Sequence, residues 1–347
     1  MTHYLSISPK QSQIIKGIAI LIMIYHHFFG GYAVPIDLET VKTTDHLFEF
    51  FSRFARSGKI CISLYAFISG YALCYIISKE NKRLISATWN RLRKVYLFFI
   101  FMCILIYTLI SIFPCPISFN LSGLFIQLSG YQSCIPDYWY ISVVLTSILI
   151  YFPILLLGYR KGNTMHAILC YTLMTINMSI AVSPYMFYTL KWDFMLPLYK
   201  LHNMGLMSEV VLTMPFFMLG YSLNHALKTR AKQDIILFAA AIVFCFFAYN
   251  PKWAFVILAC VVVTNSVLSK LTIVGSPLAY LGKYSMCMWL NHRLIFGYWF
   301  ADCFYSLPTP LNYILIVLLS LALSILITKT YESSALFIRK KLLKCQS

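Results

Sequence analysis

The segment Ile14–Val34 reads IIKGIAILIMIYHHFFGGYAV, and it decides the class of fold. It is mostly apolar and long enough to cross a bilayer as a helix, which takes about 20 residues. It nevertheless carries Lys16, His26 and His27, although ionisable groups inside an apolar span are costly to bury. At about 3.6 residues per turn, positions eleven apart return to nearly the same helix face, so Lys16 and His27 share one stripe. The stripe predicts a reacting imidazole about 16 Å deeper in the membrane than the lysine.

The composition extends this interpretation to the whole chain. Of its 347 residues, 60% are hydrophobic and 11% are charged, whereas a soluble domain carries about 25% charged residues. We therefore predict an all-α, polytopic integral membrane protein with about ten transmembrane helices. The apolar runs that mark them lie near 14–34, 59–78, 95–113, 138–158, 165–183, 208–227, 235–250, 253–269, 279–300 and 311–329.

These runs predict a single membrane domain over 1–347, with a membrane-spanning region at 14–329 and a basic cytoplasmic tail at 330–347. The first span lacks the small-residue cleavage pattern of a signal peptide, so we expect it to be retained.

The distribution of basic residues predicts the orientation, because Lys and Arg gather in cytoplasmic loops. With the N-terminus inside, cytoplasmic segments hold 20 of the 28 Lys and Arg residues, outer segments hold seven, and Arg293 lies within a span. Both termini are therefore predicted to be cytoplasmic. The same rule accounts for the formal charge of +17, and we expect the lipid bilayer rather than a nucleic acid as the partner of these charges.

The eleven cysteines are mostly scattered through apolar runs, where cysteine behaves as a small core residue. No CxxC pair and no Cys/His cluster with metal spacing occurs, so no metal site is predicted. Cys115 and Cys134 share one outward-facing loop, where a disulfide is an open possibility.

Two interpretations of the Lys16/His27 stripe stand side by side. In one, His27 is a packed side chain bonded to a neighbouring helix, and Lys16 extends its amine to the inner interface. In the other, both belong to a functional site, as intramembrane ionisable groups often do. Further polar segments along the chain favour the functional interpretation.

The first of these segments is Phe67-Ile-Ser-Gly-Tyr71. Ser69 and Gly70 are small enough to let two helices approach closely, and we favour this packing role over catalysis by Ser69.

The second segment is the cytoplasmic run Trp89-Asn-Arg-Leu-Arg-Lys94, which enters the third span. Positive-inside anchoring explains its charge. The guanidinium groups of Arg91 and Arg93 also suit bidentate binding of the phosphates of a donor arriving from the cytoplasm.

The third segment is Asn291-His292-Arg293, a polar cluster inside the ninth span. It suits either polar bonding between helices or a role in the site. Asp137 and Glu209 begin the fourth and sixth spans, where either can orient a histidine; capping of their helices is the favoured role.

Taken together, the order and spacing of these segments resemble the acyltransferase 3 family of bacterial membrane O-acyltransferases, which acylate surface polysaccharides. Lys16 and His27 match that family's basic residue, ten intervening residues and histidine. Phe67–Tyr71 resembles its Ser-Gly-aromatic segment. Arg91 and Arg93 match its Arg-x-Arg, and Leu281–Ser285 with Trp289–His292 is similar to its late motif. Lys16 stands where arginine is commoner, and Asn291 stands where an aromatic is commoner.

The resemblance implies a membrane O-acetyltransferase in the bacterial inner membrane, with acetyl-CoA or another acyl-CoA as donor substrate and no permanently bound cofactor. The acceptor would be a carbohydrate or a lipid-linked glycan. Some family members carry a hydrolase-like extracellular domain; its absence from this sequence implies direct transfer onto the acceptor.

An acceptor hydroxyl must lose a proton as it attacks a thioester, and histidine suits that step. We predict His27 as general base, Lys16 for charge or donor positioning, and Arg91 and Arg93 for the phosphates of the donor. Ser69, Glu209 and His292 are further candidates, and a covalent acyl-histidine is left open. The alternative function is a transporter or flippase for a lipid-linked glycan, in which buried charges line the route. A non-catalytic scaffold is disfavoured because it needs no buried stripe.

Overall fold

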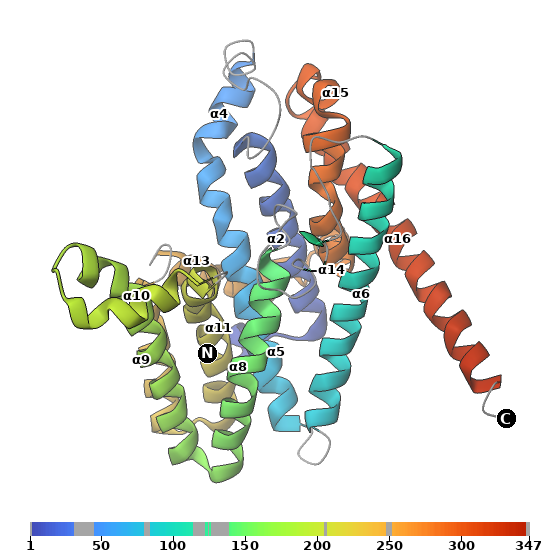
Figure 1. The fold of residues 1–347 in the computed structure, drawn as a ribbon. Helices are drawn as coiled ribbons and strands as arrows, with labels where there is room; N and C mark the ends of the chain where they lie inside the picture. Colours follow the sequence, from blue (N-terminus) through green and yellow to red (C-terminus); the bar gives the residue numbers. More distant parts are fainter. Residues whose placement is uncertain are drawn as a thin grey trace. The chain divides into compact units, whose positions relative to one another are not determined.

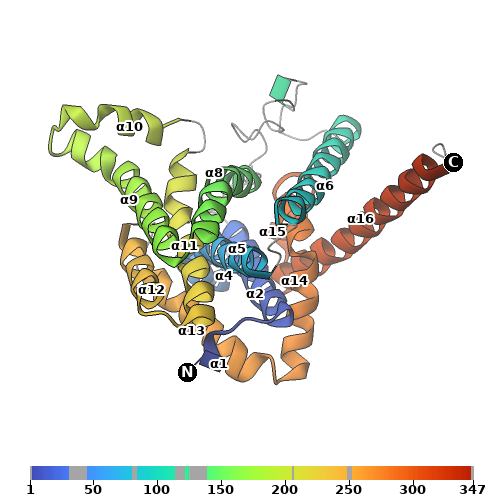
Figure 2. The same cartoon turned by 90° about the horizontal axis from the view of Figure 1, so that it is seen from below.

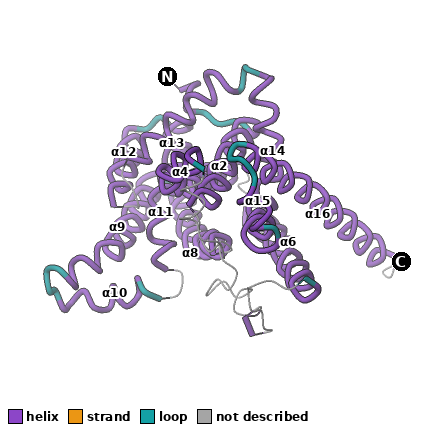
Figure 3. The backbone as a smooth tube through the Cα atoms, turned by 90° about the horizontal axis from the view of Figure 1, so that it is seen from above, coloured by secondary structure: helices purple, strands orange, loops and turns teal. Residues whose placement is uncertain are grey.

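The computed structural model describes residues 2–30, 45–79, 84–113, 122–123, 125, 139–204, 207–247 and 252–344 (Figure 1). Every regular element in this part of the chain is a helix, as the tube in Figure 3 shows. The predicted all-α fold is therefore confirmed. Cys115, Cys134 and Asp137 lie outside the described residues.

The described part of each of the ten predicted stretches falls on a long helix or on a helix with a short extension. These helices are α2 (Pro9–Gly30), α5 (Ile60–Lys79), α6 (Leu84–Ile112), α8 (Trp139–Lys161), α9 (Asn163–Tyr188), α11 (Met207–Thr229), α12 (Lys232–Phe244), α13 (Lys252–Val263), α14 (Thr272–Arg293) and α16 (Leu311–Lys344). Shorter α-helices are α1 (Thr2–Leu5), α4 (His46–Phe54), α10 (Leu196–His202) and α15 (Ala301–Ser306). The 3-10 segments are η1 (Ala55–Lys59), η2 (Asp193–Met195) and η3 (Cys245–Phe247), and the π-helical segments are η4 (Thr264–Leu268) and η5 (Leu294–Trp299).

By length and composition, six helical stretches of the described chain are suited to crossing a membrane. They are Pro9–Gly30, His46–Ser78, Leu92–Ile112, Asn163–Tyr188, Met207–Thr229 and Leu311–Leu336. A multi-pass membrane protein follows, while the count of ten spans and the cytoplasmic termini stay predictions. The predicted basic tail at 330–347 is helical as far as Lys344, because α16 continues to that residue, and its cytoplasmic location stays a prediction.

The chain divides into two compact units, which are described one at a time. The first unit contains Met1–Ser8, Ile62–Lys94 and Asn120–Lys270, and the second contains Pro9–Cys61, Val95–Phe119 and Leu271–Ser347.

In the first unit, α5 and α11 touch backbone to backbone through two glycines. A Cβ atom on Gly70 would lie 1.9 Å from the carbonyl oxygen of Phe217, and one on Gly220 would lie 2.0 Å from that of Phe67. Because neither position has room for a methyl group, glycine sets how closely these helices approach. In the same unit α8 and α9 lie side by side (Figure 2), and Phe187 of α9 stacks on Tyr199 of α10 with ring centroids 4.9 Å apart.

In the second unit, α2 and α14 make the same kind of contact. A Cβ atom on Gly17 would lie 2.0 Å from the carbonyl oxygen of Leu278, and one on Gly282 would lie 1.9 Å from that of Gln13. This close approach brings side chains on α2 within reach of side chains on α14, and it positions the site described next.

Candidate active site

Two histidines from opposite ends of the sequence meet between α2 and α14. Nδ1 of His27 lies 2.7 Å from Nε2 of His292, although 265 positions separate the two residues. Their rings are nearly parallel, with centroids 5.0 Å apart and planes inclined by 9°. His292 is fully buried and His27 is partly exposed. This pair is the candidate catalytic centre of the second unit.

Hydrogen bonding assigns the proton positions in the pair. Nδ1 of His292 lies 2.7 Å from the carbonyl oxygen of Trp289 and 3.1 Å from that of Met288. A carbonyl oxygen only accepts, so Nδ1 carries the proton and Nε2 of neutral His292 is the acceptor. His27 must then donate its Nδ1–H to this nitrogen. In its neutral form His27 therefore carries its lone pair on Nε2, as a general base requires.

The polar cluster Asn291-His292-Arg293 divides its roles. The side-chain amide of Asn291 donates to Oγ of Ser324 at 2.8 Å and to the carbonyl oxygen of Ser320 at 3.4 Å, both on α16. Asn291 thus forms hydrogen bonds between helices, whereas His292 forms a hydrogen bond with His27. Arg293 is buried at 7% exposure, and the chain changes from α to π geometry directly after it. Such π turns are frequent at functional sites.

His26 holds α2 to the segment that precedes α5. Its Nδ1 donates to the carbonyl oxygen of Ala55 at 2.6 Å, and the side chain is 4% exposed. Its Cβ lies only 2.5 Å from where a Cβ on Gly58 would be. The adjacent histidines therefore do different things, since His26 anchors the backbone while His27 reaches His292.

Aromatic side chains close off the buried side of the pair. Phe28 stacks on Tyr305 with centroids 4.9 Å apart and meets Phe296 edge-on at 5.4 Å. The Tyr305 hydroxyl donates to the carbonyl oxygen of Phe28 at 3.1 Å, and Phe296 lies 5.9 Å from the ring of His292. This wall keeps water from the buried face of His292, which strengthens the hydrogen bond to His27.

Asp45 fastens α4 to the turn before α16. Its carboxylate accepts from the backbone N–H groups of Leu47 at 2.9 Å, Phe48 at 3.0 Å and Thr309 at 3.1 Å. Burial acts to raise the pKa of Asp45, but hydrogen bonds from Thr309, Phe48 and Leu47 outweigh it and lower that pKa below its usual value. The ionised carboxylate is thus an N-cap of α4.

The other predicted residues of the stripe and of the basic run occupy ordered helix. Lys16 is half-buried on α2, and the unbroken helix places it about 16 Å along the axis from His27. Arg91 and Arg93 lie in the first third of α6, and the side chain of Arg93 is exposed. The basic run is therefore helical and continuous with the span that it enters.

Ser69 and Glu209 belong, like Arg91 and Arg93, to the first unit. The Ser69 hydroxyl donates to the carbonyl oxygen of Tyr65 on its own helix at 2.8 Å. Glu209 lies in the first turn of α11, where a carboxylate complements the helix dipole. Of the predicted site residues, the structure brings His27 and His292 into contact.

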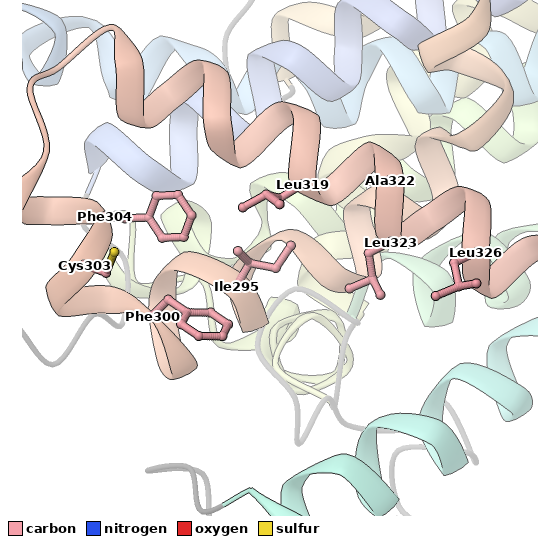
Figure 4. Close-up of a pocket in the computed structure, with 8 residues that line it drawn as sticks. All are labelled: Ile295, Phe300, Cys303, Phe304, Leu319, Ala322, Leu323 and Leu326. Atoms are coloured by element: carbon pink, nitrogen blue, oxygen red, sulfur yellow. The ribbon is translucent and has the colours of Figure 1, made fainter.

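Two further features were not predicted from the sequence. His166, His225 and Asp234 form a buried cluster in the first unit; the signal for them is an ionisable residue within or beside an apolar run. The second unit contains an apolar cavity of about 560 Å³ between η5, α15 and α16 (Figure 4). Its lining is hydrocarbon apart from the Cys303 thiol, so the histidine pair is the better candidate for proton transfer.

Comparison with known families agrees with this site. The model of the acyltransferase 3 family, described as an acyltransferase domain, matches residues 11–329. The match covers most of the chain and includes both histidines of the pair. Neither the curated proteins nor the solved structures contain a match.

Proposed function

Because this chain belongs to the acyltransferase 3 family, and is therefore a multi-pass membrane acyltransferase, we propose that it acylates a surface polysaccharide or its lipid-linked precursor. The group transferred is acetyl, the donor is a cytoplasmic acyl-CoA, and the bond formed is an ester to a sugar hydroxyl. The location is the bacterial inner membrane, which meets acyl-CoA on one side and growing glycans on the other.

The observation that carries the proposal is the hydrogen bond from His27 Nδ1 to His292 Nε2 at 2.7 Å. It leaves the lone pair of neutral His27 on Nε2, which removes the proton of the acceptor hydroxyl as the oxygen attacks the thioester carbonyl. The resulting imidazolium keeps its Nδ1–H bonded to His292. Collapse of the tetrahedral intermediate breaks the C–S bond, and the proton passes from His27 to the departing sulfur.

The remaining residues are assigned to binding. CoA carries several phosphate groups, and the planar forks of Arg91 and Arg93 suit them. Lys16 supplies positive charge for positioning the donor. Ser69 donates to its own helix and Gly70 packs against α11, so this segment supports helix packing. Glu209, in the first turn of α11, supports that helix.

The test is acetyl transfer by the purified protein in detergent micelles, with isotopically labelled acetyl-CoA and oligosaccharide acceptors. Micelles have no second compartment, so a transporter or flippase gives no acetyl-transfer signal in this assay. His27→Gln is expected to lower the rate about 10²–10⁴-fold, while His46→Gln, on the exposed first turn of α4, leaves it unchanged. Full activity of His27→Gln would overturn the assignment of the base.

The same assay separates general-base catalysis from an acyl-histidine. If Nε2 of His27 attacks the thioester itself, labelled acetyl appears on the protein when acceptor is left out. Under the general-base mechanism the protein stays unlabelled, and label reaches only the glycan.

A further inference from the structure

Three residues with metal-binding side chains converge inside the first unit. His166 comes from α9, His225 from α11 and Asp234 from α12. One ligand atom from each lies within 4.8 Å of the others. The exposed fractions are 1%, 3% and 0% for the three residues in that order. The cluster lies within one unit, and the proposed acyl transfer does not use it.

The bonding within the cluster is incomplete. Oδ2 of Asp234 accepts from the Thr229 hydroxyl at 2.6 Å, and Oδ1 lies 3.3 Å from Nδ1 of His225. Three of the buried polar atoms make no aligned hydrogen bond to any residue that the structure describes: Asp234 Oδ1, His225 Nδ1 and His166 Nδ1. Burial of polar atoms without hydrogen bonds costs about 1–3 kcal/mol each, and a buried carboxylate needs a counter-charge. The cluster thus brings two imidazole nitrogens and one carboxylate close together in a buried space.

The chemistry of the donors identifies the ligand. Two imidazoles and a carboxylate form a set that binds zinc and other divalent first-row metals, whereas Ca²⁺ and Mg²⁺ prefer oxygen ligands. Tetrahedral zinc with bonds of about 2.0–2.1 Å spaces its ligand atoms about 3.4 Å apart. The separation of 3.3 Å between His225 Nδ1 and Asp234 Oδ1 already matches this spacing. We propose that His166, His225 and Asp234 bind one zinc ion.

A neighbouring side chain orients one of these ligands. The Tyr221 hydroxyl lies 2.8 Å from Nε2 of His166. With Nε2–H donated to that oxygen, Nδ1 carries the lone pair of His166, and it is Nδ1 that makes no aligned hydrogen bond within the described chain. Metal-bound histidines commonly hold the other ring nitrogen in this way. The imidazoles of His166 and His225 are stacked, with centroids 4.2 Å apart and planes inclined by 14°, so one ring must turn for both nitrogen lone pairs to reach a single ion.

The site connects three helices of the first unit that share no disulfide among the described cysteines. A bound ion would join α9, α11 and α12 at one point, and because the three ligands are at most 3% exposed, the fourth position is closed to bulk solvent, unlike the open position of a catalytic zinc. Binding to the folded state alone stabilises that state. The expected role is therefore structural, with metal content and thermal unfolding as readouts that do not depend on acyl transfer.

The experiment measures metal in the full-length protein, purified in detergent through a tag without histidine. Mass spectrometry of the metal is expected to find about one zinc per chain. Asp234→Asn, which keeps the shape of the side chain, and His225→Gln are expected to abolish it. The matched controls are Asp193→Asn and His46→Gln, which change exposed residues of the same types and should retain zinc.

Two further measurements complete the test. Removal of zinc with a chelator is expected to lower the unfolding midpoint of the wild-type protein and to leave that of Asp234→Asn unchanged. Cobalt added to the metal-free wild-type protein should give the visible absorption of a four-coordinate Co²⁺ site. A wild-type protein that holds no zinc, as purified or after zinc is added back, would overturn the proposal. Zinc retained in both cluster variants would do so as well.

Discussion

Replacement of His292 by leucine removes the acceptor that holds the Nδ1–H of His27, while an apolar side chain of similar size still fills the buried space. The wild-type bond is 2.7 Å long and shielded by aromatic side chains. In the proposed mechanism, it supports a positive charge on His27 once the acceptor proton is taken. A hydrogen bond to a charged group contributes about 1.5–3 kcal/mol. Its loss in the transition state corresponds to a fall in kcat of about 10- to 150-fold.

The assay is steady-state acetyl transfer in micelles, with kcat and KM measured separately for donor and acceptor. His292→Leu should lower kcat and change KM little, because the contact strengthens only as charge develops. His292→Gln retains an acceptor oxygen and should recover part of the lost rate. The double variant His27→Gln/His292→Leu should be no slower than His27→Gln alone, since His292 acts through His27.

The opposite pattern would refute the reasoning. If His292→Leu slowed the His27→Gln enzyme by the same factor as the wild type, the two histidines would act independently. If His292→Leu and wild type had equal kcat, the bond between them would have no part in the reaction. The unfolding midpoint of each variant shows whether a lower rate reflects loss of folded protein instead.

Three further predictions concern packing, acid stability and the donor. Gly282→Ala places a methyl group 1.9 Å from a backbone oxygen and should destabilise the fold by at least about 1–3 kcal/mol in thermal or denaturant unfolding. Gly297→Ala, whose Cβ meets its nearest neighbour at 4.0 Å, is the control and should unfold like wild type. The pKa of Asp45 is lowered in the folded state, so its stabilising effect is present above the usual carboxyl value and is lost as the pH falls below about 4. In unfolding midpoints measured against pH, Asp45→Asn should therefore flatten the acid limb, and an unchanged limb would contradict this. Arg93→Lys, which keeps the charge but loses the fork, should raise the KM for acyl-CoA more than that for the acceptor, and equal changes in both would count against a donor site.

The sequence was sufficient for the fold class because each helix carries its own signal. Apolar runs of about 20 residues predict spans without knowledge of their neighbours, and helices occupy the described part of each of the ten predicted stretches. The Lys16/His27 stripe likewise needs only the period of one helix, and α2 is unbroken over both residues. The family was also predicted correctly, because its motifs depend on order and spacing.

Contacts between helices were beyond the same reasoning. The positions of His27 and His292 in the sequence do not indicate that α2 and α14 pack together, or that the two histidine side chains face each other between these helices. That packing depends on Gly17 and Gly282, whose lack of a side chain matters only against a particular neighbour. The cluster of His166, His225 and Asp234 was missed for the same reason, since its members come from three helices and match no metal-binding spacing.

The carbonyl oxygen of Trp289 sets a limit on how a proton can travel through this site. It accepts from His292, and a carbonyl has no proton to pass on, so the chain that runs from His27 through His292 stops there. Along this chain of hydrogen bonds between described residues, a proton taken up at Nε2 of His27 is not passed on beyond His292, and in the proposed mechanism it leaves from the edge by which it arrived. In the proposed mechanism, the sugar hydroxyl and the departing CoA sulfur would therefore use that edge in turn, and one nitrogen atom would serve both halves of the reaction.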